Sequence, residues 1–143
     1  MKTRKQGGFT LIELVVVIAL LGILAAFAIP RFASLEREAR AATTQGLSGS
    51  VRSAAAMAHG LFLATGSSPV SMEGNNIVIT NGYPDATDIQ NTLADSTGFT
   101  VTVNAGNDTA TFVKTGASGT CEVVYVEAVS PNPPSITVDT SGC

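Results

Sequence analysis

Residues 9–29 read FTLIELVVVIALLGILAAFAI, and this stretch decides the fold of the chain. Its one charged side chain is Glu13. A helix over these residues would be about 31 Å long, close to the thickness of the hydrocarbon core of a bilayer. The basic head MKTRK at residues 1–5 precedes it, and positive flanks of this kind hold a helix end in the cytoplasm. We therefore expect one inner-membrane span, with everything after Pro30 outside the cytoplasm.

Two ordinary alternatives could account for such an N-terminus. A secretory signal peptide would use a small-x-small cleavage site, which Ala26-Phe27-Ala28 offers, but its apolar core is normally shorter. A plain membrane anchor fits the hydropathy equally well, yet it has no use for a carboxylate that costs about 2.5–3.5 kcal/mol to insert. Glu13 is therefore the residue that argues for a functional helix.

Glu13 has no basic partner inside the apolar stretch, but proteolysis could create one. A cut between Gly8 and Phe9 would give Phe9 a free α-amino group, four residues before Glu13. That spacing is about one helical turn, so the amine and the carboxylate could pair within one subunit or between neighbouring subunits.

The stretch GFTLIEL at residues 8–14 resembles the N-terminal signature shared by type IV pilins and the pseudopilins of type II secretion. The resemblance implies a prepilin peptidase that cuts after Gly8 and N-methylates Phe9. It implies that Glu13 attracts the Phe9 amine of a neighbouring subunit during assembly. The implied partners are copies of the same chain, the inner membrane before assembly, an assembly ATPase with platform proteins, and minor pilins. No cofactor is implied.

A narrower resemblance is to pilins of the mannose-sensitive haemagglutinin type. It rests on PRF at residues 30–32, AATTQGL at 41–47 and SAAAMAH at 53–59.

Gly22 and Pro30 fall where pilins carry residues that weaken the helix. Proline removes a backbone donor and costs a helix interior about 3 kcal/mol, and glycine costs up to about 1 kcal/mol relative to alanine. We expect residues 23–29 to loosen in a packed filament; a simple kink is the alternative.

Small and apolar residues continue at helical spacing beyond Pro30, so we expect a helix over about residues 9–63. Its second half, residues 31–63, is amphipathic and needs a sheet to lie on. A break in the pattern near Gly46 and Gly49 indicates a bend or a change of packing partner.

The remainder of the chain alternates apolar and polar residues between turn signals, as half-buried antiparallel strands do. We expect strands at residues 76–80, 99–103, 110–114, 121–129 and 135–139, and a short helix within residues 85–94 with Ile89 and Leu93 inward. The predicted fold class is α+β, a spine helix whose C-terminal half packs on a small antiparallel sheet. The expected divisions are a cleaved leader (1–8), a membrane and filament-core segment (9–30), the amphipathic helix (31–63) and the head (64–143).

Cys121 and Cys143 are the two cysteines. In an exported chain such a pair forms a disulfide, here closing a loop of about 23 residues and stabilising the fold by about 3 kcal/mol. Two free thiols in a cytosolic protein are the alternative.

Catalytic and metal-binding patterns are missing from the sequence. His59 is the one histidine, and its alanine-rich surroundings indicate a packing or interface role and not catalysis. Asp85, Asp88 and Asp95 do not have the spacing of a calcium loop, and no metal site is expected. The chain has eight basic and eleven acidic residues. Three of the basic residues lie within residues 1–5, so the rest of the chain is acidic and is not expected to bind nucleic acid.

These observations favour a structural subunit and not an enzyme. The first hypothesis is the major pilin of a type IV pilus used for adhesion or surface attachment, held in the inner membrane before assembly and extracellular afterwards. The second is a pseudopilin of a type II secretion system. The third is a membrane-anchored binding module that never polymerises.

Overall fold

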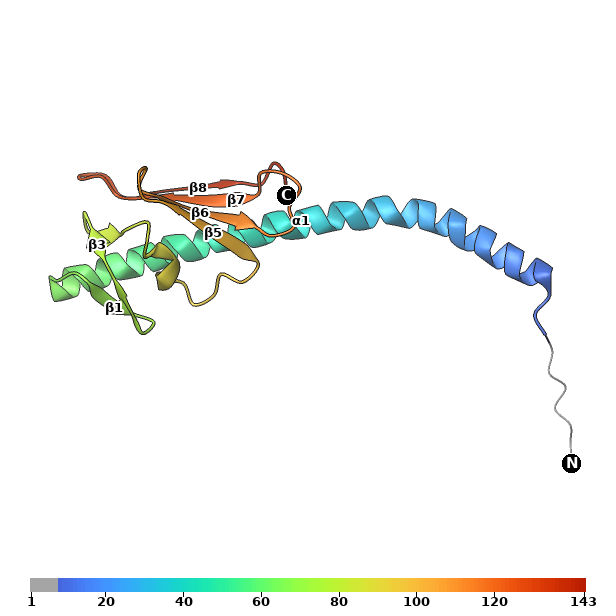
Figure 1. Ribbon diagram of the computed structural model, residues 1–143, viewed down its shortest axis with the longest axis horizontal. Helices are drawn as coiled ribbons and strands as arrows, with labels where there is room; N and C mark the ends of the chain where they lie inside the picture. The colour runs from blue at the N-terminus through green and yellow to red at the C-terminus, as the bar shows by residue number, and fades with distance from the viewer. Residues whose placement is uncertain (1–7) are drawn as a thin grey trace, which may run out of the picture. The chain divides into compact units, whose positions relative to one another are not determined.

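The computed structural model describes residues 8–143, so most of the expected leader, including the basic head at residues 1–5, lies outside the described residues. The chain divides into one compact unit that ends at Arg37 and another over Glu38–Cys143. Helix α1 (Leu11–Thr65) is followed by short strands and one turn of 3-10 helix (Figure 1). These elements are β1 (Val70–Met72), β2 (Asn75–Ile77), β3 (Ile79–Thr80), β4 (Tyr83–Pro84), η1 (Ile89–Thr92), β5 (Phe99–Asn104), β6 (Thr109–Lys114), β7 (Glu122–Val126) and β8 (Ser135–Asp139).

The predicted fold class is confirmed, because a small antiparallel sheet packs against the long N-terminal helix. Strands β5, β6, β7 and β8 form this sheet in sequence order, and every neighbouring pair is antiparallel (Figure 1). The sheet buries Phe112, Val123 and Tyr125 completely, and α1 contributes Leu47 and Val51 to the same core. Their period-two and period-four spacings are those of one strand face and one helix face.

A second core cluster lies under the two-stranded β1–β2 sheet. Ala58 of α1 packs there with Val70, Met72 and Ile77. The sequence does not predict β1, because the strand follows a segment typical of a loop, residues 66–69, and its three residues are too few to show an alternating pattern.

The prediction of one strand over residues 76–80 is wrong in detail, since two short strands, β2 and β3, occupy it and pair with different partners. The backbone N–H of Val78, between them, donates to the carboxylate of Asp88 at 2.8 Å instead of to a strand. The predicted short helix within residues 85–94 is reduced to η1, with Ile89 fully buried and Leu93 partly buried.

Helix α1 stays helical through Gly22 and Pro30, and also through Gly46 and Gly49. Its buried residues begin at Thr44, next to the predicted break in the pattern. The change there is one of packing partner. The expected loosening of residues 23–29 concerns the filament and stays a prediction.

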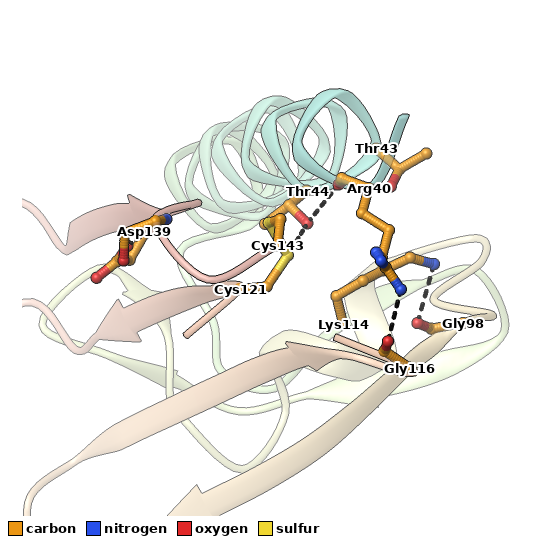
Figure 2. The surroundings of a disulfide bond; sticks show 10 residues. Arg40, Thr43, Thr44, Gly98, Lys114, Gly116, Cys121, Asp139 and Cys143 are labelled. Carbon is orange, nitrogen blue, oxygen red and sulfur yellow. Dashed lines mark hydrogen bonds between the residues drawn. A yellow bond between two sulfur atoms is a disulfide. The ribbon is translucent and has the colours of Figure 1, made fainter. Parts of the chain in front are cut away.

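The C-terminal loop is tied to the start of β7 by a disulfide between Cys121 and Cys143 (Figure 2). Both cysteines are buried, and their Cα atoms lie 4.8 Å apart. The hydroxyl of Thr44, on α1, lies 3.3 Å from the sulfur of Cys121. Nearby, the guanidinium of Arg40 donates to the carbonyl of Gly116 at 2.6 Å (Figure 2). The disulfide loop therefore lies directly against the helix within the unit Glu38–Cys143.

Candidate functional site

The first turn of α1 is closed by a reciprocal pair of side chains, Thr10 and Glu13. The hydroxyl oxygen of Thr10 accepts the backbone N–H of Glu13 at 3.3 Å. The Oε2 atom of Glu13 accepts the backbone N–H and the hydroxyl of Thr10, both at 2.8 Å. This is a capping box, in which the residue before the helix and the third helical residue satisfy each other's backbone donors.

Because of the capping box, the carboxylate of Glu13 has hydrogen-bond partners that are not basic side chains. Thr10 is not among the residues predicted for this site, although its Thr-x-x-Glu spacing to Glu13 is itself a helix-start signature. The partial positive charge at a helix N-terminus also favours a carboxylate at this position. An ionised carboxylate has about four acceptor positions, so Glu13 can bind Thr10 and still accept a further cationic donor.

Gly8 and Phe9 precede the helix and belong to no regular element. Both are exposed, and the Phe9 side chain is 94% exposed. The peptide bond between them therefore lies in accessible backbone, the kind of segment that proteases cut most readily.

The apolar part of α1 exposes its large side chains on every face. They include Leu11, Ile18, Leu24 and Phe27, each more than half exposed. By length and composition this helix can cross a membrane, with a mean hydropathy of 2.9 over its most apolar window. A helix that is apolar on every face is stable only where lipid or other protein covers its surface.

The other residues singled out in the sequence belong to other parts of the chain. Gly22 and Pro30 lie farther along α1, and Cys121 and Cys143 lie in the unit Glu38–Cys143. The site thus consists of Gly8, Phe9, Thr10 and Glu13 at the helix start, together with the apolar surface that follows.

His59 has a packing contact. Its ring stacks on Tyr83 with the ring centroids 4.2 Å apart and the planes within 5°. Its Nδ1 atom lies 2.6 Å from the carbonyl oxygen of Gly82. No sequence pattern pointed to Tyr83 as its partner.

The acidic residues near η1 serve turns. Asp88 binds the amide of Val78, and Asp85 accepts the hydroxyl of Thr87 at 2.7 Å. Across residues 8–143 no group of three His, Cys, Asp or Glu side chains is placed to hold a metal ion.

The similarity of this chain to known proteins includes the helix start. Residues 3–29 match the prokaryotic N-terminal methylation motif. The start of the chain is similar to that of type IV pilins. The chain is 51% identical over 51 residues to the type IV narrow pilus major component PilA5 of Thermus thermophilus, a match that covers 36% of this chain and 44% of that protein. It is 46% identical over 46 residues to the type II secretion system core protein G of Pseudomonas aeruginosa, covering 32% of each chain.

The matched part of this chain spans less than half the length of either relative. No solved structure matches it. The narrower resemblance to mannose-sensitive haemagglutinin pilins stays a prediction.

Proposed function

We propose that this protein is the major pilin of a type IV pilus, a subunit that polymerises through the first half of α1 into an extracellular filament for adhesion or surface attachment. The observation that supports this most strongly is the apolar helix, exposed on every face and headed by a capped carboxylate. In the membrane, lipid would cover this surface. In a filament, the same surface of other subunits would replace the lipid.

The proposed processing starts in the inner membrane, with the N-terminus in the cytoplasm. A prepilin peptidase removes residues 1–8 and N-methylates Phe9. Residues 9–30 then form the filament core, and residues 31–63 carry the head, residues 64–143. An assembly ATPase, platform proteins and minor pilins complete the machine.

The proposed role of Glu13 is to guide each new subunit into register. While the subunit is still in the membrane, its bonds to Thr10 satisfy part of the carboxylate and so lower the cost of burying it. At the growing filament the cationic Phe9 amine of a neighbour supplies the remaining partner. N-methylation keeps that nitrogen charged, so the attraction survives it.

Two variants separate the charge from the helix cap. Glu13→Gln keeps a capping box, since glutamine serves at the same position, but removes the charge. Thr10→Ala keeps the charge and removes the cap. Because a hydrogen bond to a charged group contributes about 1.5–3 kcal/mol, we expect Glu13→Gln to lower the filament fraction at least ~tenfold.

The measurement compares pilin in sheared filaments with pilin left in the membrane. Thr10→Ala should reduce incorporation less than Glu13→Gln does. If Glu13→Gln subunits enter filaments as well as the unmodified protein, the charge has no part in assembly.

The similarity to a type II secretion core protein favours a second candidate, a pseudopilin. Imaging of the producing cells distinguishes the two, because a major pilin forms long surface filaments at its native expression level. Mass spectrometry of the mature N-terminus tests both against a non-polymerising anchor: methylated Phe9 supports a filament subunit, and an intact leader supports the anchor.

A further inference from the structure

An open cleft of about 650 Å³ lies beside α1 in the unit Glu38–Cys143. It is formed by the helix, the turn between β1 and β2, and the segment that follows η1. Its lining is small or apolar for the most part, and includes Gly46, Gly49, Ser53, Met57, Met72 and Leu93. A second helix could approach α1 closely there, because little side-chain volume stands in the way.

The fold of the subunit does not require the two glycines in this cleft. A Cβ atom added to Gly46 or Gly49 would meet nothing within 4 Å. Each glycine costs a helix interior about 0.5–1 kcal/mol relative to alanine. The two glycines therefore destabilise the helix slightly, leave room on its outer surface and are not needed for close packing within the subunit.

The charged residues at the cleft are all acidic. Among the described residues that line it, Glu73 and Asp95 are charged, and neither Lys nor Arg is present. An occupant that fits this cleft needs apolar side chains for its walls and a cation for its rim.

One segment of the chain itself has this composition. IPRFASL at residues 29–35 contains a single charged side chain, Arg31. Phe32 is 70% exposed and Leu35 is 61% exposed. Residues three and four apart share a helix face, so Arg31, Phe32 and Leu35 form one basic and apolar knob on α1.

We propose that the knob of one copy docks into the cleft of a second copy. The inference rests on the proposed filament function and adds a subunit contact beyond the apolar segment at residues 9–29. The knob and the cleft are different surfaces of the same chain, so the contact is heterologous. Repeated without closure, a heterologous contact produces an open filament.

A leucine in the cleft tests the proposal. Gly49→Leu places a large side chain in the cleft at a position where an added Cβ meets nothing within 4 Å, and Gly60→Leu is the matched control. Gly60 is also an exposed helix glycine with nothing within 4 Å of an added Cβ, but it does not line the cleft. Both variants are made in the full chain, in cells with a pilus assembly machine.

We expect Gly49→Leu to lower the filament fraction about tenfold, the effect of blocking a contact by overpacking. The thermal midpoint of the detergent-solubilised subunit should not fall. Gly60→Leu should assemble like the unmodified protein. Equal filament yields for Gly49→Leu and the unmodified protein, or an equal loss for both variants, would overturn the proposal.

A cysteine pair gives a direct reading of the contact. Leu35→Cys combined with Ser53→Cys should give a ladder of oxidised multimers from sheared filaments, since the native cysteines are already bonded to each other. Leu35→Cys combined with Ala56→Cys, an exposed position outside the cleft, should give none.

The two proposals fail in different ways. Filaments without the ladder, or Ser53→Cys linked to a different protein, would overturn the knob-and-cleft contact and leave the pilin function standing. If the unmodified protein forms no filaments, the proposed function itself fails.

Discussion

Replacing Gly142 by alanine should loosen the C-terminal loop from the loop that precedes β7. A Cβ at Gly142 would lie 2.6 Å from the Cα of Gly119 and nearer still to the backbone nitrogen of Thr120. These are main-chain atoms that cannot rotate away, so one loop has to move. The movement breaks two backbone hydrogen bonds, from Gly119 N–H to the Gly142 carbonyl at 3.1 Å and from Gly142 N–H to the Thr120 carbonyl at 2.7 Å.

At about 1 kcal/mol for each bond, Gly142→Ala should lower the free energy of unfolding by about 2 kcal/mol. For a unit of roughly 100 residues this corresponds to a fall of about 8 °C in the melting temperature. Both tyrosines, Tyr83 and Tyr125, lie in the unit Glu38–Cys143 and the chain has no tryptophan. Tyrosine fluorescence of the full chain in detergent therefore follows this unit and not the apolar helix.

Gly106→Ala is the matched control. Its added Cβ would lie 3.5 Å from the side-chain oxygen of Asn104, which is an ordinary contact. If Gly142→Ala melts within a degree of Gly106→Ala, the close approach of the two loops does not stabilise the unit, and the reasoning is refuted.

Two further substitutions test single hydrogen bonds. Tyr125→Phe should lower the free energy of unfolding by about 1–3 kcal/mol in urea titrations, because the buried hydroxyl donates to the carbonyl of Pro84 in β4 at 2.6 Å and that carbonyl would lose this donor. Burial raises the pKa of Tyr125, so the hydroxyl keeps its proton and remains a donor. An unchanged urea midpoint would contradict this role of the hydroxyl. The hydroxyl and the amide of Ser141 hold the pKa of Asp139 below its ordinary value. Their contribution to stability is therefore present above about pH 4 and is lost as the pH falls through the lowered value. Ser141→Ala should raise the pKa of Asp139 in an NMR titration of its carboxyl group, and an unmoved titration would exclude the hydroxyl as the cause.

The first half of α1 could be predicted from the sequence because its signal is local. Twenty-one residues with a single charge specify a helix without reference to the rest of the chain, and α1 is helical over Leu11–Thr65. The spacing of Thr10 and Glu13 also indicates the capping box, but the prediction for Glu13 considers only a partner of opposite charge.

The details of the head depend on contacts between distant residues. The break between β2 and β3 arises because the carboxylate of Asp88, ten residues away, binds the amide of Val78. His59 stacks on Tyr83, twenty-four positions further along the chain, and the pattern around either residue does not reveal the other. Short strands of two or three residues are likewise set by tertiary packing and not by propensity.

The alternation along β5 has a consequence for how this protein can change over time. Thr100, Thr102 and Asn104 point to solvent, whereas Val101 and Val103 pack against the core. Substitutions at the outward positions would change the surface of the unit Glu38–Cys143 and leave its interior untouched. The outer face of this strand can therefore diverge in sequence at little risk to folding.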